Sequence, residues 1–378
     1  MPRKDLPSTV ARRTGGTLWL AASAVGAVTA LVASLALSTT MNTADSQPLA
    51  HQTPAPTTTS LAATTTNSTS TTPTSTTSPS RATTAVTRPA TGTTLGGCPN
   101  LPADNIWHAT VTSLPVQPNS SQYVASIGAS AKVHADFGAG DWDGGPIGIP
   151  ITYVSGSQPK VPVTFDYAGE SDPGPYPIPA DAAVESGGDR HVLVVDRDNC
   201  RLYELYDAER RPDGSWHAGS GAVFDLRGDQ LRPAGRTSAD AAGLPILPGL
   251  VRYDEVAAGR VDHAIRVTVP RTQQEHLWPA RHDAGASNAA LPPMGLRLRL
   301  KANVDVSGLP TQARVIAQAM KTEGVIVADN GSPWYISGIP EPRWDNDALQ
   351  ALAALHGTDF EAVDASGLMV SPDSGRTR

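Results

Sequence analysis

The residues best suited to chemistry lie in the clearest hairpin pattern of the chain, the run HVLVVDRDNCRLYELYDA from His191 to Ala208. Two β-branched and aromatic stretches flank a turn-forming Asp-Arg-Asp-Asn cluster. A two-residue turn at Asp198-Asn199 would place Leu193 opposite Glu204, which makes His191 a diagonal neighbour of Glu204 on an apolar face. Burial raises the pKa of a carboxyl group and a nearby imidazolium lowers it, so this pair is a candidate for general acid–base catalysis.

A second carboxylate is needed if this pair belongs to a glycoside hydrolase, because most such enzymes use two. Three aspartates in turn-rich or strand-end sequence are candidates: Asp196, Asp240 and Asp329. The alternative for the histidine–glutamate pair is structural, either as a buried hydrogen-bonded pair or on an edge strand with Glu204 in water. A slip in the strand register would also separate the two.

Aromatic residues in turn-rich sequence are candidates for sugar binding. The chain has 7 Trp but only 4 Phe, and flat indole faces suit stacking on sugar rings as well as core packing. The segment Trp278-Pro-Ala-Arg-His-Asp283 concentrates an aromatic, a cation, an imidazole and a carboxylate in a predicted loop, although surface turns can have the same composition. The candidate substrate-binding residues are Trp278, Arg281, His282 and Trp334.

Several other functions are disfavoured by the sequence. There is no G-x-S-x-G elbow, P-loop, dinucleotide fingerprint or H-E-x-x-H motif, and the 9 histidines lack ligand spacing. We therefore expect no metal and no cofactor. The net charge of -7, with no basic cluster in the folded part, makes nucleic acid an unexpected partner.

The elements that position these residues are predicted to be mainly strands. His263–Val269 and Leu296–Lys301 alternate as half-solvated antiparallel strands, the latter with leucines inward and its basic residues outward. Residues 312–323 have helical spacing, 325–336 resemble a second hairpin with a turn at 329–331, and 348–355 form a last helix. We expect a mainly β ectodomain, an antiparallel sandwich or jelly-roll-like fold with a few helices.

Two cysteines, Cys98 and Cys200, are the only ones in the chain. An even count in an exported chain predicts a disulfide, which would leave no free thiol for nucleophilic catalysis. The sequence Leu95-Gly-Gly-Cys98 also resembles a bacterial lipobox. That signal requires an apolar stretch directly upstream, where this chain has a Thr/Pro-rich segment, so the disulfide is the favoured interpretation.

The N-terminal part predicts export. Residues 18–37 contain no charge and are long enough to cross a bilayer, and basic residues precede them. We expect a basic cytoplasmic tail over residues 1–16 and a transmembrane signal-anchor over 17–39. The alternative is a cleaved signal peptide, which would make the protein secreted, although its apolar region is usually shorter.

The segment that follows, residues 40–95, is dominated by Ser, Thr, Pro and Ala and cannot bury a core, so we predict a disordered linker. A single β-rich ectodomain is expected over residues 96–370, with a frayed tail over 371–378. The ectodomain would lie outside the cell membrane, with the N-terminus in the cytoplasm.

Several stretches, including HVLVVDRDNCRLYELYDA, HAIRVTVPRT, WPARH and MGLRLRLKA, resemble an uncharacterised family of secreted or membrane-anchored proteins of high-GC actinobacteria. The resemblance covers most of the chain from Cys98 to about Asp364. It implies an exported bacterial ectodomain and carries over no catalytic residue, because no activity is established for that family.

Together these patterns favour an extracytoplasmic cell-envelope protein that acts on polysaccharide, with a glycoside hydrolase as the leading hypothesis. The alternatives are a non-catalytic carbohydrate-binding or adhesion module, which would expose a row of indoles, and a structural envelope protein. The expected partners are the membrane, through one span, and a cell-wall or extracellular polysaccharide.

Overall fold

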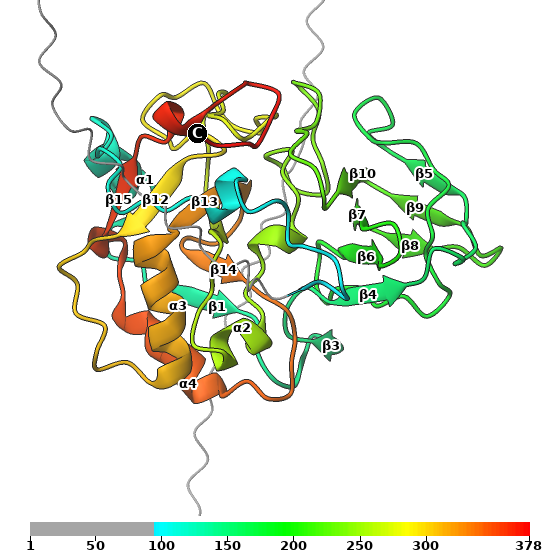
Figure 1. Cartoon of the computed structure of the whole chain (residues 1–378), viewed down its shortest axis with the longest axis horizontal. Coiled ribbons are helices and arrows are strands. Elements are labelled where there is room, and N and C mark those ends of the chain that lie inside the picture. The colour runs from blue at the N-terminus through cyan, green and yellow to red at the C-terminus, as the bar shows by residue number, and fades with distance from the viewer. Residues whose placement is uncertain (1–93) are drawn as a thin grey trace, which may run out of the picture. The chain divides into compact units, whose positions relative to one another are not determined.

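A computed structural model describes residues 94–378 of the 378-residue chain (Figure 1). The predicted signal-anchor and nearly all of the predicted linker lie outside the described residues. Within residues 94–378, no helix is long and apolar enough to cross a membrane. The described part is mainly β, with several sheets and few helices.

A six-stranded mixed sheet forms the centre of the fold, in the order β1-β14-β11-β13-β12-β15. Its strands β1 and β14 are parallel, as are β11 and β13, whereas the other neighbours are antiparallel. The strands are β1 (His134–Asp136), β11 (Ile265–Val269), β12 (Arg297–Leu300), β13 (Val325–Asn330), β14 (Tyr335–Ser337) and β15 (Phe360–Val363).

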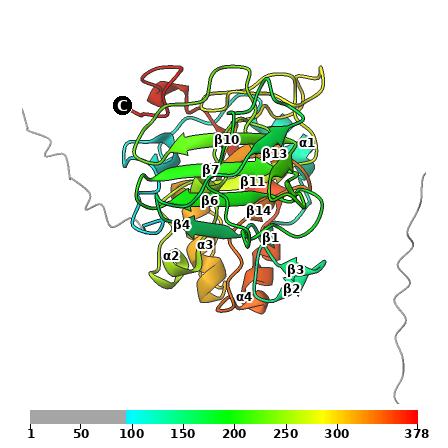
Figure 2. The same ribbon diagram turned by 90° about the vertical axis from the view of Figure 1, so that its right-hand side faces the viewer.

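A four-stranded sheet, in the order β10-β7-β6-β4, packs against the first sheet. Figure 2 shows these four strands side by side in front of the six-stranded sheet, and Leu193 and Leu202 share one core cluster with Val267 and Leu298. The strands are β4 (Ile151–Val154), β6 (Val192–Asp196), β7 (Arg201–Tyr206) and β10 (Ser220–Asp225).

Two smaller sheets extend this body. One is the hairpin of β2 (Asp141–Trp142) and β3 (Gly145–Pro146). The other has the order β5-β9-β8, with β5 (Val163–Phe165), β8 (Glu209–Arg210) and β9 (Trp216–Ala218).

The helices are short, and α3 is the longest of those described. Most of its apolar residues, among them Ile316 and Met320, are buried in the main core. Figure 1 shows α3 and α4 next to each other over the six-stranded sheet. The helices are α1 (Ser120–Gly128), α2 (Tyr253–Ala257), α3 (Thr311–Thr322) and α4 (Asn346–Gln350), with 3₁₀ turns at Ile106–His108, Leu247–Gly249, Ala351–Ala354, Gly357–Asp359 and Ser366–Leu368.

The first predicted hairpin is confirmed, with Leu193 opposite Glu204 and Val195 opposite Leu202. The prediction of a second hairpin over residues 325–336 is wrong. Strands β13 and β14 do not pair, because β11 lies between them and bonds to both. The expectation of purely antiparallel pairing is also wrong for four strand pairs. Strand β11 lies about 60 residues earlier in the sequence than β13, so nothing in residues 325–336 indicates that β11 pairs between the two strands.

The predicted outward position of the basic residues in β12 is wrong for Arg297, which is 3% exposed. Its guanidinium donates to the carbonyls of Ile106, Ala109 and Glu323. Alternation along a strand shows which residues share a face of the sheet, but it does not show whether that face is exposed. Another segment of the chain covers the face that carries Arg297, so backbone oxygens rather than water accept its hydrogen bonds.

The last predicted helix, over residues 348–355, is shorter and starts earlier than expected. The α-helix α4 ends at Gln350 and continues as a 3₁₀ turn. Its N-cap is Asp345, whose carboxylate accepts the N–H of Ala348. The helix predicted over residues 312–323 is present as α3, shifted by one residue.

Both ends of the ectodomain are fastened to its body. Cys98 and Cys200 form the predicted disulfide, with their Cα atoms 5.4 Å apart. Residues 371–378, expected to fray, instead hydrogen-bond to the body: Gly375 N–H donates to the Asp229 carbonyl and Thr377 N–H donates to the Asp104 carbonyl. These bonds hold the C-terminal segment in place.

Candidate active site

A buried ion pair lies where the six-stranded sheet faces the four-stranded one. Arg266, on β11, donates through Nε and Nη2 to the two carboxylate oxygens of Asp240, each at 2.9 Å. Asp240 is 0% exposed and Arg266 is 4% exposed. This two-bond geometry is the strong form of an Arg–carboxylate pair and fixes both side chains.

Asp329 joins this pair from the neighbouring strand β13. Its Oδ2 lies 3.2 Å from Nη2 of Arg266, and a register shift between β11 and β13 brings Asp329 opposite Thr268. Arg266 also donates through Nη1 to Oγ of Ser337 on β14, at 2.7 Å. One guanidinium therefore links three strands and two aspartates.

The Asp329 side chain is 22% exposed, and its protonation differs from that of an ordinary aspartate. Burial, the charge of Asp240 and a hydrogen bond with that carboxylate raise the pKa of Asp329 to about 8, against the opposing effect of Arg266. Two carboxyl groups in contact cannot both ionise easily, so one retains a proton. Asp329 is therefore a carboxylic acid near neutral pH, able to donate a proton.

Asp329 lines a cavity of about 360 Å³, which falls within the range of roughly 300–1,000 Å³ typical of small-ligand sites. The aromatic side chains of Tyr167 and Tyr206 line it, with the carboxylates Glu170 and Asp189 and the imidazole of His282. Apolar faces and several hydrogen-bonding groups thus surround one protonated acid. We call this cavity the acid cavity.

A second buried pair adjoins the acid cavity. His191, at the start of β6 and 2% exposed, bonds through Nδ1 to Glu185 and through Nε2 to the carbonyl of Ala239, which lines the cavity. Burial alone would lower the pKa of His191, but the Glu185 carboxylate outweighs it and raises that pKa to about 9. The imidazole is therefore a buried cation at neutral pH, paired with Glu185.

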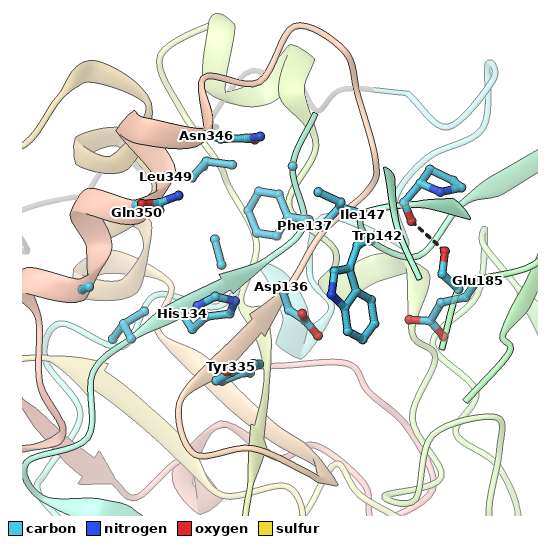
Figure 3. Close-up of a pocket in the computed structure, with 17 residues that line it drawn as sticks. His134, Asp136, Phe137, Trp142, Ile147, Glu185, Tyr335, Asn346, Leu349 and Gln350 are labelled. Carbon is cyan, nitrogen blue, oxygen red and sulfur yellow. Dashed lines mark hydrogen bonds between the residues drawn. The ribbon is translucent and has the colours of Figure 1, made fainter. Parts of the chain in front are cut away.

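A larger cavity, of about 710 Å³, lies between β1, α4 and the β2–β3 hairpin (Figure 3). We call it the tryptophan cavity because the indole of Trp142 lines it. It is connected to the ion-pair cluster through strand pairing: Asp136, which lines it, lies beside Ser337, the residue that accepts a hydrogen bond from Arg266. The two cavities therefore flank the same buried cluster.

Of the five predicted catalytic residues, the fold brings His191, Asp240 and Asp329 together around Arg266. Glu204 is close enough to influence them electrostatically, but it is 0% exposed and lines neither cavity. Its carboxylate accepts the backbone N–H groups of Ile246 and Leu247 at the start of a 3₁₀ turn. Glu204 thus has a structural role as a helix cap.

Asp196 is also structural. It accepts the N–H groups of Asp198 and Asn199 and the side-chain amide of Asn199, which closes the turn between β6 and β7. Burial would raise the pKa of Asp196, but these hydrogen bonds hold it below its usual value. The carboxylate lines neither cavity.

The four predicted substrate-binding residues are dispersed. His282 lines the acid cavity, 3.6 Å from the Glu170 carboxylate. Trp278 and Arg281 instead hold the C-terminal segment, through bonds to the Ser374 carbonyl and the Asp373 carboxylate. Trp334, 1% exposed, packs on Phe360 and donates to the Gly128 carbonyl.

Sequence reasoning missed the residues that organise the site. Arg266 lies in a strand that is predicted to be half-solvated, and nothing local indicates that a second sheet covers its polar side. Trp142 had a detectable signal, because Asp143-Gly144 directly after it is a two-residue turn sequence typical of hairpins. Asp136 and Glu185 had no recognisable motif.

Residues 94–378 contain no group of three or more His, Cys, Asp or Glu residues placed to hold a metal ion. Comparison with protein-family models, with curated proteins and with solved structures finds no match. The function must therefore be argued from the site itself.

Proposed function

We propose that this chain is an extracytoplasmic enzyme that cleaves glycosidic bonds in a polysaccharide, with Asp329 as the proton donor. The observation that carries the proposal is a carboxyl group with a pKa of about 8 that lines a cavity of ligand size. Cleavage of a glycosidic bond requires protonation of the departing oxygen, and a carboxylic acid still protonated at neutral pH suits that step.

Asp240 and Arg266 act as positioning residues in this proposal. Asp240 raises the pKa of Asp329 by charge and by a hydrogen bond, and Arg266 fixes Asp240 through two bonds. When Asp329 gives up its proton, the new carboxylate lies 3.2 Å from the Arg266 guanidinium. The cation thus stabilises the charge that the proton transfer creates.

The cluster does not support the mechanism in which two touching aspartates jointly activate a water, as in aspartic proteases. Asp240 is among the residues that line the acid cavity, but both of its carboxylate oxygens are engaged by Arg266 and its side chain is fully buried, so the carboxylate is not free to activate a water. The candidates for a second carboxylate are Glu170 and Asp189, which line the acid cavity. Either would stabilise the positive charge of an oxocarbenium-like transition state.

The extracytoplasmic location is part of the proposal. It is supported by the apolar segment of residues 18–37, the basic residues before it and the disulfide, a bond typical of oxidising compartments. We propose a single-span anchor with the ectodomain outside, or secretion if the segment is cleaved. The two sheets that share one core support a sandwich-like arrangement.

A second candidate function is non-catalytic carbohydrate binding. The observation that favours it is Trp142, which is 65% exposed beside a cavity. Stacking on sugar rings would make use of this indole without any reaction.

The test is reducing-end release from a panel of polysaccharides by the detergent-solubilised full-length chain. Asn at position 329 keeps the shape of a protonated Asp but cannot donate a proton to the leaving oxygen, so Asp329→Asn should lower kcat by about 100- to 10,000-fold. The matched control is Asp213→Asn, the same change at an exposed turn. Binding without release by the wild type would favour the second candidate.

A further inference from the structure

We infer that the tryptophan cavity binds a sugar unit with a free amino group, a hexosamine of the glycan, with its ring on Trp142 and its ammonium at Asp136. The inference depends on the proposed function only in taking a glycan as the ligand. It assigns a substrate class and a binding site separate from the acid that would do the chemistry.

The first observation is an indole held open to solvent. Trp142 is 65% exposed, although its position is fixed by the β2–β3 hairpin, whose turn at Asp143-Gly144 has φ angles of 51° and 88°. An exposed indole on a fixed backbone beside a cavity offers a flat apolar face, which is the surface that sugar rings stack on. Figure 3 shows the Trp142 indole next to Asp136.

The second observation is that this hairpin is tied down on both sides. On one side, the hydroxyl group of Ser186 donates to the carbonyl of Pro146 in β3, at 3.2 Å. The side-chain amide of Asn346, on α4, exchanges two hydrogen bonds with the backbone of Ala139, each at 2.9 Å. A platform held in this way binds a ligand with little loss of conformational entropy.

The third observation is the charge of the cavity. Its lining includes the carboxylates of Asp136 and Glu185 and no Lys or Arg. Glu185 is already paired with the buried His191, whereas within residues 94–378 the Asp136 carboxylate has no hydrogen bond or ion pair. Burial raises the pKa of Asp136; His134 and Arg266 attract its charge, and Glu185 and Asp189 oppose it. One carboxylate is thus left for a ligand.

These groups select among glycans by charge. Uronic acids and sulfated sugars would meet the unpaired Asp136 carboxylate and be repelled, because the charge of Glu185 is balanced by His191. Neutral sugars would stack on the indole but leave Asp136 without a partner. An ammonium on the ring would pair with Asp136 in a partly desolvated cavity, where such pairs are stronger than in water. The amide of Gln350 and the ring of His134, which also line the cavity, are available for hydroxyl groups.

The experiment uses three oligosaccharides with the same β-1,4-linked ring, which differ only at C2: oligomers of glucosamine, of N-acetylglucosamine and of glucose. Each is titrated by calorimetry into the full-length Asp329→Asn chain, which retains both cavities but should not cleave. We expect the glucosamine oligomer to bind at least about 10-fold more tightly than the glucose oligomer, a difference of about 1.4 kcal/mol.

Two variants locate the site. Asp136→Asn should abolish the preference for glucosamine and leave the affinity for the glucose oligomer within about 2-fold. Trp142→Ala should weaken binding of all three oligomers by about 10-fold or more. Asp213→Asn removes the same charge at an exposed turn and should leave the preference intact, and circular dichroism checks that each variant is folded.

Equal affinity for the glucosamine and glucose oligomers would overturn the assignment of the substrate class. A Trp142→Ala chain that is folded and binds all three as before would overturn the location. Failure of the proposed function is a different result: if the wild type binds glucosamine oligomers through Trp142 and Asp136 but releases no reducing ends from any glycan, the binding site stands and the catalytic role of Asp329 falls.

Discussion

The free energy of unfolding of Asp329→Asn, measured relative to that of the wild type, should increase as the pH rises. The sign follows from the protonation of the two states. In the unfolded chain the aspartate releases its proton near pH 3.8, whereas the folded protein retains it up to about pH 8. Between these values the folded state holds one more proton, so wild-type stability falls as the pH rises.

The magnitude follows from the size of that interval. At about 1.4 kcal/mol for each pH unit, a pKa that moves from 3.8 to about 8 sets a ceiling of about 6 kcal/mol on the change. Asp240 and Arg266 contact Asp329, and His191 also acts on it by its charge, so part of the change is shared among them. We expect a measured change of about 2–4 kcal/mol.

The assay is urea unfolding of the full-length chain, followed by tryptophan fluorescence from pH 4 to pH 9. The quantity of interest is the free energy of unfolding of Asp329→Asn minus that of the wild type, because the titration of groups far from Asp329 cancels in the difference. It should rise from about pH 4 to pH 8 and level off above that. Asp213→Asn, at an exposed turn, should show no such rise. A difference that stays flat for Asp329→Asn would refute the raised pKa and with it the proton-donor role.

Three further predictions concern the scaffold. The double change Cys98→Ser and Cys200→Ser opens a crosslink between residues 102 apart and should lower the free energy of unfolding by about 4–5 kcal/mol in the chain-entropy model, and an unchanged urea midpoint would contradict this. Glu204→Gln weakens the cap of a buried 3₁₀ turn and should cost about 1–3 kcal/mol of stability near pH 4.5. Burial raises the pKa of Glu204 to about 7, so this cost should shrink as the pH rises toward 7. Glycan cleavage should be retained, and its loss in a folded variant would return Glu204 to the site. Burial would raise the pKa of Glu255, but Arg252 and the imidazole of His263 lower it to about 2 through charge and hydrogen bonds, so the stability that Glu255 contributes is present above pH 4.5 and lost as the pH falls toward 2. Urea unfolding should therefore show Glu255→Gln about 3 kcal/mol less stable than the wild type at pH 7 and nearly equal to it at pH 2, and an equal deficit at both pH values would count against this.

The sequence was most informative where structure is decided locally. The hairpin around Asp198 was predicted with its register, because a short turn fixes which residues face each other. The second hairpin failed because β11 enters the sheet between β13 and β14. Pairings between distant segments depend on the whole fold, so the same apolar runs fit either arrangement.

The same distinction applies to the site. Asp240 and Asp329 were selected by residue type and turn context, but their contact depends on Arg266, which comes from a third segment of the chain. Glu204 was ranked first because a carboxylate on an apolar strand face is costly. That cost is reduced by two backbone N–H groups about 40 residues away in sequence, which no local pattern reveals, although burial still raises the pKa of Glu204 to about 7.

If Asp329 gives its proton to a departing sugar oxygen, the rate of reducing-end release must depend on that proton, and comparison of the wild-type and Asp329→Asn chains across the polysaccharide panel measures this. We expect release by the wild type and by Asp213→Asn, with release by Asp329→Asn reduced by about 100-fold or more. Release at an unchanged rate by a folded Asp329→Asn chain would contradict this role of Asp329.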